Sequence, residues 1–153
     1  MRISVITVCF NAAATLTDAV QSVLSQAPSP EASFDLEYIV VDGGSTDGTL
    51  DMLAPFRDRI ATLISEPDRG LYDAMNKGIR TATGDVVAIL NADDVYASTD
   101  VLAQVARAFT ASGTDAVYGD LNYVAADTLS RVTRRWRSGA YSPGAFRRGW
   151  MPP

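Results

Sequence analysis

The sequence contains no histidine and a single cysteine among its 153 residues. The lack of histidine excludes, within these residues, a nucleophilic site built on a Ser–His or Cys–His pair and a His-ligated zinc site. Cys9 has no partner for an internal disulfide, which is typical of a protein from a reducing compartment. Carboxylates are therefore the side chains from which chemistry is expected.

Membrane-crossing and phosphate-loop signals are also missing. No run of 18 apolar residues could span a bilayer, and the segment from Met1 to Cys9 has neither the length nor the cleavage site of a signal peptide. We therefore expect a cytoplasmic protein. The sequence has no GxxxxGK[ST] and no GxGxxG pattern, which argues against a P-loop nucleotidase and a dinucleotide-dependent dehydrogenase.

Acidic residues are missing from the last part of the chain. The first 129 residues hold all 18 acidic side chains and seven basic ones, a net charge of −11, whereas the rest carries +6. The late basic residues are Arg131, Arg134, Arg135, Arg137, Arg147 and Arg148. An acidic chain of this kind is not expected to bind nucleic acid, but its last segment suits phosphate or an anionic surface.

Short apolar runs alternate with helical patterns along the chain. Strands are expected over Ile3–Val8, Glu37–Val41, Ala61–Ile64, Val86–Leu90 and Ala116–Tyr118. Helices are expected over Leu16–Leu24, Thr49–Phe56, Leu71–Ala82 and Asp100–Ser112, with Thr15, Asp47 and Ser98 or Thr99 as caps. Near-continuous hydrophobicity is typical of strands covered on both faces. The alternation predicts an α/β fold with a Rossmann-like, mostly parallel sheet flanked by helices.

Polar and acidic residues follow three of the expected strands. Asn11 follows the first, Asp42 the second, and Asn91, Asp93 and Asp94 the fourth. Ligands of open parallel sheets bind beyond the carboxyl ends of the strands, so these side chains are expected to share one crevice. Adjacent carboxylates need a compensating cation, and Mg²⁺ or Mn²⁺ held by one or two carboxylates suits a diphosphate-bearing substrate.

Four sequence blocks together resemble one enzyme family. They are ISVITVCFN (Ile3–Asn11), YIVVDGGSTDG (Tyr38–Gly48), EPDRGLYDAMNKG (Glu66–Gly78) and GDVVAILNADDVY (Gly84–Tyr96). In this order and spacing they resemble the family 2 glycosyltransferases, which have a GT-A fold. The resemblance implies sugar transfer, with inversion and with Mg²⁺ or Mn²⁺, from a nucleotide-diphosphate donor such as a UDP-sugar. The implied acceptor is a saccharide or lipid-linked molecule in polysaccharide or glycolipid synthesis.

The resemblance also implies roles for individual residues. The implied donor-site residues are Thr7, Val8, Cys9, Asn11, Asp42, Asp68, Asn76, Asn91, Ala92 and Asp93, and the implied metal ligands are Asp93 and Asp94. Asp42 matches the carboxylate that recognises the nucleotide base. Asp93 and Asp94 fall at the Asp-x-Asp motif, which contacts the ribose and the metal.

The chain departs from the family pattern in two ways. Asn91 stands where many relatives have Asp, so the metal rests on Asp93 or Asp94, and the sequence does not choose between them. In inverting relatives the base that deprotonates the acceptor lies well beyond the donor half, yet no acid follows Asp127. Asp120 is the late candidate; otherwise the base lies in residues that this chain lacks. We expect a donor portion over 1–125 and an incomplete acceptor portion over 126–153.

Several alternatives stay open. The arginine- and aromatic-containing segment from Arg131 to Trp150 is an acceptor-side loop, a peripheral contact with the inner face of a membrane, or a piece without its packing partners. The whole chain is alternatively a nucleotide-binding fragment without sugar transfer. A phosphoacceptor receiver domain is disfavoured, because the first strand ends in Cys9-Phe10-Asn11 and not in an acidic pair.

Overall fold

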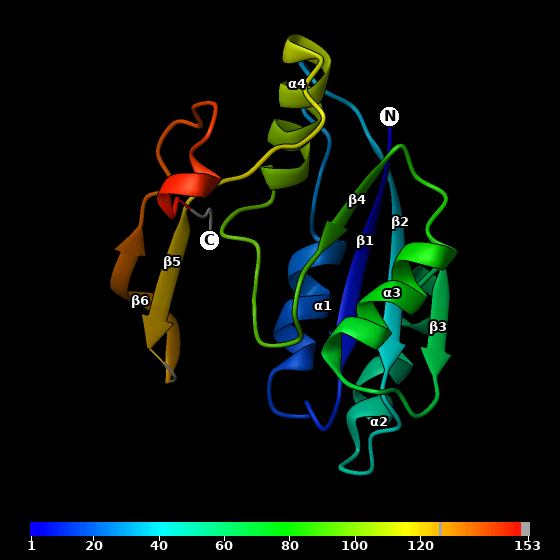
Figure 1. Cartoon of the computed structure of the whole chain (residues 1–153). Helices are drawn as coiled ribbons and strands as arrows, with labels where there is room; N and C mark the ends of the chain where they lie inside the picture. The colour runs from blue at the N-terminus through cyan, green and yellow to red at the C-terminus, as the bar shows by residue number, and fades with distance from the viewer. Residues whose placement is uncertain (126, 151–153) are drawn as a thin grey trace. The chain divides into compact units, whose positions relative to one another are not determined.

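The computed structural model of the chain describes residues 1–125 and 127–150. The chain divides into two compact units, of which unit 1 covers Met1–Ala111 and unit 2 begins at Ser112 (Figure 1). The elements up to the boundary are β1 (Arg2–Cys9), α1 (Leu16–Leu24), β2 (Asp35–Asp42), α2 (Thr49–Leu53), the 3-10 helix η1 (Ala54–Arg59), β3 (Thr62–Ser65), α3 (Leu71–Thr81), β4 (Val86–Ile89) and α4 (Val101–Ser112). Unit 2 contains β5 (Leu121–Ala125), β6 (Thr128–Trp136) and the 3-10 helix η2 (Phe146–Arg148).

Unit 1 is built on a four-stranded parallel sheet in the order β3-β2-β1-β4. β1 pairs with β2 along its whole length, from Arg2 opposite Asp35 to Cys9 opposite Asp42. All four carboxyl ends therefore lie at one edge of the sheet, which is where the sequence placed the polar residues. The predicted α/β fold with a mostly parallel sheet is confirmed.

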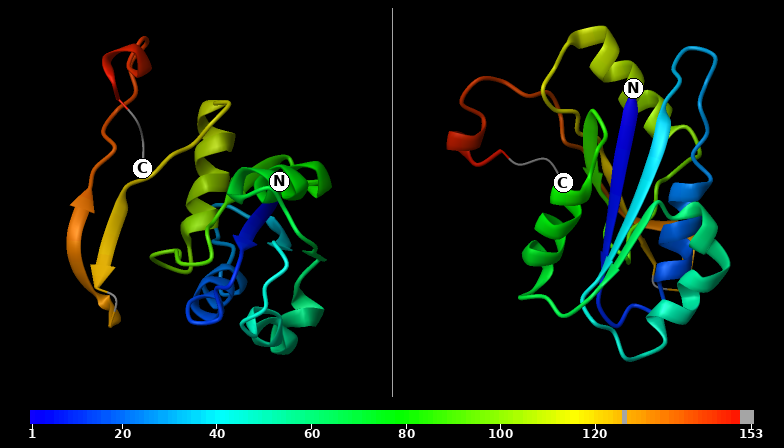
Figure 2. Two further views of the ribbon diagram at one scale, coloured as in Figure 1. Left: turned by 60° about the horizontal axis from the view of Figure 1, so that its bottom comes forward. Right: turned by 90° about the vertical axis from the view of Figure 1, so that its right-hand side faces the viewer.

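Helices cover both faces of this sheet (Figure 2). On one face Val5, Tyr38 and Val40 belong to the core that includes residues of α1, α2 and α4. On the other face Ile6 and Ile39 belong to the core that includes Ala74 of α3. Successive residues of β1 and β2 thus alternate between two apolar layers, which explains why their sequences show no polar alternation.

The helix ends are held partly by residues from elsewhere in the chain. The expected cap Asp47 is wrong in position: Gly48 is the N-cap of α2, and the Asp47 carboxylate accepts from the Thr49 N–H at 3.0 Å from one residue before it. Thr15 makes no side-chain cap bond to α1. At the start of α4 the Leu102 N–H donates to Gln26 Oε1 at 2.9 Å. The side chain that bonds to the first turn of α4 is therefore that of Gln26, just beyond α1, and not that of the expected caps Ser98 or Thr99. Local sequence patterns do not reveal a partner so far away in the chain.

Unit 2 departs from the sequence prediction. The expected strand at Ala116–Tyr118 is wrong, because these residues form no strand. The strands are instead β5 and β6, an antiparallel pair in which Tyr123 lies opposite Arg134. β6 carries exposed arginines and threonines, so it lacks the apolar pattern by which the other strands were found. Ala126, where the expected acceptor portion begins, and residues 151–153 lie outside the described residues.

Candidate functional site at the carboxyl edge of the sheet

Asp42 ends β2 and organises the loop that follows it. Its side chain is fully buried. Its carboxylate accepts hydrogen bonds from the Ser65 hydroxyl at 2.7 Å, the Gly44 N–H at 3.2 Å, and both the N–H and the hydroxyl of Ser45. Asp42 thus ties the end of β2 to the end of β3, and Ser45 and Ser65 are hydrogen-bond partners that sequence reasoning missed.

The protonation of two neighbouring groups follows from these contacts. Burial by itself would raise the pKa of Asp42, but the hydrogen bonds from Ser45, Ser65 and Gly44 outweigh it and hold that pKa below its usual value. Burial, with the Asp42 carboxylate 3.9 Å from the Cys9 Sγ, raises the pKa of the Cys9 thiol to about 12. Asp42 is therefore ionised and Cys9 is an uncharged, unreactive thiol.

The other predicted residues of the first strand end have structural partners as well. The Asn11 Oδ1 accepts from the Thr46 N–H at 3.0 Å, and the Asn11 N–H donates to the Ser45 Oγ at 2.8 Å. Thr7 accepts from the Tyr38 hydroxyl at 3.0 Å, and Val8 is buried against α3. Thr7 and Val8 are thus part of the buried end of β1, whereas Asn11 is exposed and joins the loop after β1 to the loop after β2.

Asp68 lies at the surface of the same edge. Its Oδ1 accepts from the Gly70 N–H at 2.7 Å, and its Oδ2 lies beside the α-carbon of Gly43. The neighbouring ring of Phe10 is 64% exposed, which is unusual for a residue that directly follows a buried strand. Phe10 is a candidate that sequence reasoning missed, because an aromatic residue there looks like a continuation of the core. The predicted Asn76 lies instead on the exposed side of α3, away from the buried Ala74 and Gly78.

The segment Asn91–Asp94 turns directly after β4. The Asp94 N–H donates to the Asn91 carbonyl at 3.1 Å, and the Asn91 Nδ2 donates to the Asp94 Oδ2 at 3.2 Å. Ala92 is buried, whereas Asp93 and Asp94 are exposed. Because β4 lies beside β1, the turn places these carboxylates at the same edge as Phe10.

The oxygen atoms of this turn suit a divalent cation. Among residues 1–125 and 127–150, the Asn91 Oδ1 is the buried side-chain atom that has no hydrogen-bond partner. No group of three or more acidic or cysteine side chains in the described part of the chain is arranged so that it could hold a metal ion by itself. Mg²⁺ and Mn²⁺ need oxygen ligands and are often held by one or two carboxylates, with substrate phosphates completing the set. The donor set of Asn91, Asp93 and Asp94 fits such an ion.

Asp120 lies in unit 2 and is already engaged. Its Oδ1 accepts hydrogen bonds from both the N–H and the hydroxyl of Ser138, each at 3.0 Å. These bonds, with a smaller contribution from Arg137, hold the pKa of Asp120 below its usual value. A carboxylate held in this way is a weak base, so its contacts favour a role in joining the start of β5 to the end of β6.

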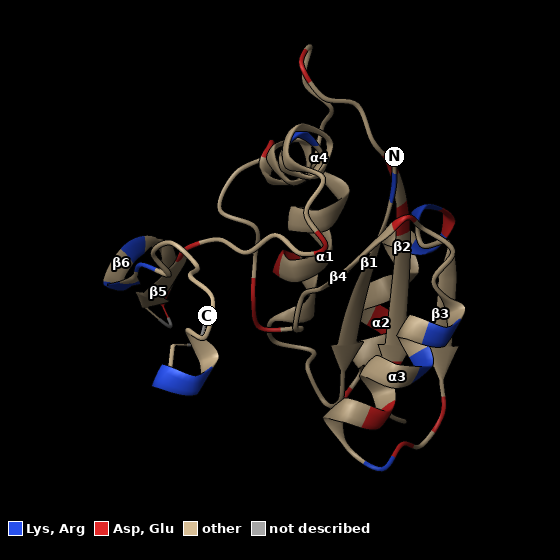
Figure 3. Ribbon diagram, turned by 45° about the horizontal axis from the view of Figure 1, so that its top comes forward, with Lys and Arg blue, Asp and Glu red and all other residues tan. Residues whose placement is uncertain are grey.

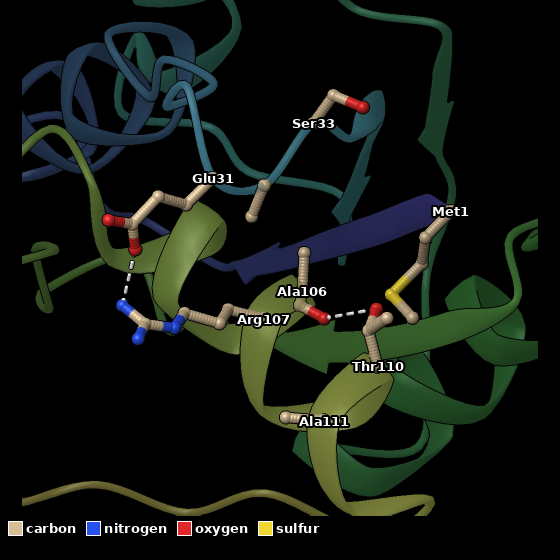
Figure 4. Close-up of a pocket in the computed structure, with 8 residues that line it drawn as sticks. Met1, Glu31, Ser33, Ala106, Arg107, Thr110 and Ala111 are labelled. Carbon is tan, nitrogen blue, oxygen red and sulfur yellow. Dashed lines mark hydrogen bonds and ion pairs between the residues drawn. The ribbon is translucent and has the colours of Figure 1, made fainter.

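Two hollows in unit 1 lie away from this edge. One of about 480 Å³ is lined by Met1, Glu31, Ala32, Ser33, Ala106, Arg107, Thr110 and Ala111 (Figure 4). A second, of about 260 Å³, shares Glu31 and Arg107, which form an ion pair of 2.5 Å between the loop before β2 and α4. Both hollows are formed by α4 and the segment before β2. They contain none of the predicted site residues.

Comparison with known sequences decides the family. The family model "Glycosyl transferase family 2" matches residues 4–151. The chain belongs to glycosyl transferase family 2. A PGL/p-HBAD biosynthesis glycosyltransferase of Mycobacterium bovis is 39% identical over 123 residues, and an uncharacterized glycosyltransferase of Mycobacterium tuberculosis is 40% identical over 111 residues. These alignments cover 77% and 72% of the chain but only 46% and 41% of those relatives.

Solved structures of glycosyltransferases share the fold. Staphylococcus aureus TarS 1–349 in complex with UDP-GlcNAc is 26% identical, with a TM-score of 0.65 over 75% of this chain and 33% of that one. The Pyrobaculum calidifontis mannosyltransferase PcManGT in complex with GDP-Man and Mn²⁺ is 28% identical, with a TM-score of 0.62 over 80% and 35%. The family 2 chain therefore has the GT-A fold. No helix within its described residues is long and apolar enough to cross a membrane.

Proposed function

We propose that this family 2 chain binds a nucleotide-diphosphate sugar, with a UDP-sugar preferred, and provides the donor half of an inverting glycosyl transfer. The observation that carries the proposal is the turn after β4. It presents the exposed carboxylates of Asp93 and Asp94 at the edge where the strands end, and it contains the buried Asn91 Oδ1, which has no hydrogen-bond partner among the described residues. The UDP-GlcNAc and GDP-Man complexes of proteins with this fold support a donor of this class.

The donor would lie along the carboxyl edge. The exposed Phe10 ring offers a flat apolar face for the nucleotide base, and Asp68 lies beside it as an acceptor of hydrogen bonds. Asp42 is buried beneath its loop, and we assign to it the role of holding the loop that forms the floor of the base pocket. Asp93 or Asp94 would contact the ribose.

Asp93 or Asp94 would hold Mg²⁺ or Mn²⁺ at the turn after β4, which also contains the Asn91 Oδ1. Such an ion, when bound, neutralises the negative charge that grows on the leaving diphosphate. The transfer we propose is a direct displacement, in which the acceptor hydroxyl attacks the anomeric carbon and the diphosphate leaves. It requires a base for the acceptor proton, and Asp120, the late candidate from the sequence, is a weak one because Ser138 holds its carboxylate.

A binding experiment tests the donor site. The full chain is titrated by calorimetry with UDP, GDP and dTDP and with their sugars, with and without Mn²⁺, and thermal shifts are recorded in parallel. A ligand that binds only the native state raises its melting temperature by mass action. We expect a metal-dependent shift with UDP or a UDP-sugar. If no nucleotide binds under any of these conditions, the proposal is wrong.

A second candidate is donor binding without transfer. It is favoured by the contacts of Asp120, because Ser138 occupies its carboxylate and its pKa is lowered. No acidic residue follows Asp127 in this chain. The two candidates differ in product formation. Transfer to a saccharide or lipid-linked acceptor by this chain supports the first, whereas donor binding with no transfer supports the second.

We also propose that unit 2 makes a peripheral contact with an anionic membrane surface that carries the lipid-linked acceptor. The rings of Tyr141, Phe146 and Trp150 contact one another, and those of Tyr141 and Phe146 are 51% and 63% exposed. Arginines lie along β6 and η2 (Figure 3). Exposed aromatic rings beside arginines suit the interface of an anionic bilayer.

Sedimentation with vesicles tests this contact. The chain is mixed with phosphatidylcholine vesicles that contain or lack phosphatidylglycerol, at low and physiological salt. We expect binding to the anionic vesicles alone, weakened by salt and by Phe146→Ser combined with Arg147→Gln. Arg80→Gln, which removes one charge from α3, serves as the control. Equal binding of the double variant and the control would contradict the proposal.

A further inference from the structure

Lys77 lies on α3, where a lysine in a helical pattern is ordinarily a solvated residue. In the structure its side chain is only 14% exposed. The ammonium nitrogen lies 2.9 Å from the Glu66 Oε1 and donates to the Pro67 carbonyl at 2.9 Å. It also lies 4.0 Å from the Asp73 Oδ2, one helical turn before it. Lys77 therefore joins α3 to the loop between β3 and α3.

This loop, Glu66–Gly70, carries Asp68 into the candidate donor site. Its first residue is fixed by the Glu66 N–H, which donates to the Asp42 carbonyl at 3.1 Å. Its far end is fixed by the Arg69 N–H, which donates to the Asp73 Oδ2 at 3.1 Å. Lys77 holds the part between these points. The loop is thus attached to the sheet at one end and to two adjacent turns of α3 along the rest.

The charges around Lys77 explain why a cation is needed there. Glu66, Asp68 and Asp73 place three carboxylates on and beside a five-residue loop. Lys77 is in direct contact with two of them, and its low exposure reduces the screening of these contacts by water. Removal of its charge would leave the carboxylates to repel one another, and the loop would lose the bond to its Pro67 carbonyl.

We propose that Lys77 is a positioning residue for donor binding, and that it acts by holding the Glu66–Gly70 loop so that the Asp68 carboxylate stays beside Gly43. It makes no contact with the donor itself. The inference rests on the proposed function, since it assigns to Lys77 a role in the same donor site.

The first part of the test needs no ligand. Backbone hydrogen exchange of the full chain is compared between wild type and Lys77→Met, a change that keeps the length of the side chain and removes its charge. We expect faster exchange at the N–H groups of Arg69 and Gly70 in the variant, with unchanged exchange in β1. Lys77→Arg is expected to retain most of the protection. Unchanged exchange at Arg69 and Gly70 in Lys77→Met would overturn the inference.

The second part measures the affinity for UDP in the presence of Mn²⁺. Lys77→Met is expected to weaken binding about tenfold, which is in the range of coupling between contacting residues. Arg80→Met removes an exposed charge from the same helix and is expected to bind as wild type does. Glu66→Gln weakens the same ion pair from its half-exposed partner, so it keeps the test informative if Lys77→Met does not fold. This variant is expected to bind UDP about threefold more weakly than wild type does.

A double-mutant cycle separates positioning from general damage. In a chain that already carries Asp68→Asn, the further change Lys77→Met is expected to have less than about a twofold effect on UDP affinity, because the group that Lys77 positions is altered. The same loss in both backgrounds would show that Lys77 acts on the fold and not through Asp68. If wild type binds no nucleotide, the proposed function is wrong, while the exchange experiment still decides whether Lys77 holds the loop.

Discussion

The Asp68 carboxylate occupies the space beside the Gly43 α-carbon in which a side chain would begin. A β-carbon at position 43 would clash with the Asp68 Oδ2 and would lie 3.4 Å from the Phe10 ring. The loops that follow β1, β2 and β3 therefore meet at one glycine. Their close approach brings an exposed ring and a carboxylate together at the carboxyl edge of the sheet.

The substitution Gly43→Ala tests this meeting point. The added methyl group must displace the Asp68 carboxylate, so we expect UDP affinity in the presence of Mn²⁺ to fall about tenfold or more. Stability should change little, because the displaced atoms are the end of a side chain. Gly119→Ala is the matched control, since a β-carbon there would meet nothing within 4 Å. Equal UDP affinity of Gly43→Ala and wild type by calorimetry would refute the assignment of Asp68 to the donor site.

The acidic pair after β4 leads to a second prediction. Asp93→Ala and Asp94→Ala alter exposed side chains, so both variants should fold with the wild-type melting temperature. The variant that removes the metal ligand should lose the Mn²⁺-dependent part of UDP affinity. Asp94 is the candidate to test first, because its Oδ2 is fixed in the turn by the hydrogen bond from the Asn91 Nδ2 at 3.2 Å. Metal-dependent affinity that is unchanged in both variants would exclude the pair from metal binding.

Glu37 is a buried acid at the opposite edge of the sheet from the site. It accepts hydrogen bonds from the Ser4 hydroxyl, from the N–H and hydroxyl of Thr83, and from Arg2 Nη2 at 3.1 Å. Burial by itself raises the pKa of Glu37, but these hydrogen bonds and the Arg2 charge outweigh it and lower that pKa from 4.5 to about 2. The ionised form is thus the one that the folded chain stabilises.

The pH dependence of stability follows from this pKa. Because the folded pKa of Glu37 lies below its unfolded value, its contribution is full above about pH 5 and is lost as the pH falls toward 2. The loss is about 3 kcal/mol by linkage. Urea unfolding of Glu37→Gln at pH 7 should show lower stability than wild type, and a flatter dependence between pH 5 and 3. Glu31→Gln, which alters an exposed ion pair, is the control. If the stability of Glu37→Gln falls between pH 5 and 3 as steeply as that of wild type, the prediction is wrong.

Gly78 sets the distance between α3 and the sheet. A β-carbon at this position would lie 2.5 Å from the Ile6 Cγ2, and both residues are buried. In an exposed helix interior Gly→Ala stabilises by about 1 kcal/mol, yet here overpacking should make Gly78→Ala destabilising by about 1–3 kcal/mol. Denaturant unfolding gives the sign directly. A stabilised Gly78→Ala variant would show that α3 can move away from β1 at little cost.

Local sequence patterns predicted most of unit 1 because its strands and helices are marked by short-range features. β-Branched apolar runs gave β1, β2, β3 and β4 to within about two residues at each end, and the apolar stripe gave α1. The β5–β6 pair was missed because its stability rests on cross-strand contacts. Arg134 of β6, for example, lies 5.3 Å from the ring centre of Tyr123 on β5, a contact that the residue pattern does not show.

The sequence by itself determined which residues stand at the strand ends, since the order of strands and the hydrophobic runs place Asp42, Asp93 and Asp94 there. Only the tertiary structure decided what each of them touches. It buried Asp42 beneath its own loop, left Asp93 and Asp94 exposed, and brought Asp68 against Gly43 and Lys77 against Glu66. The physical reason is that burial and charge pairing depend on residues far apart in the chain, whereas backbone periodicity depends on neighbours.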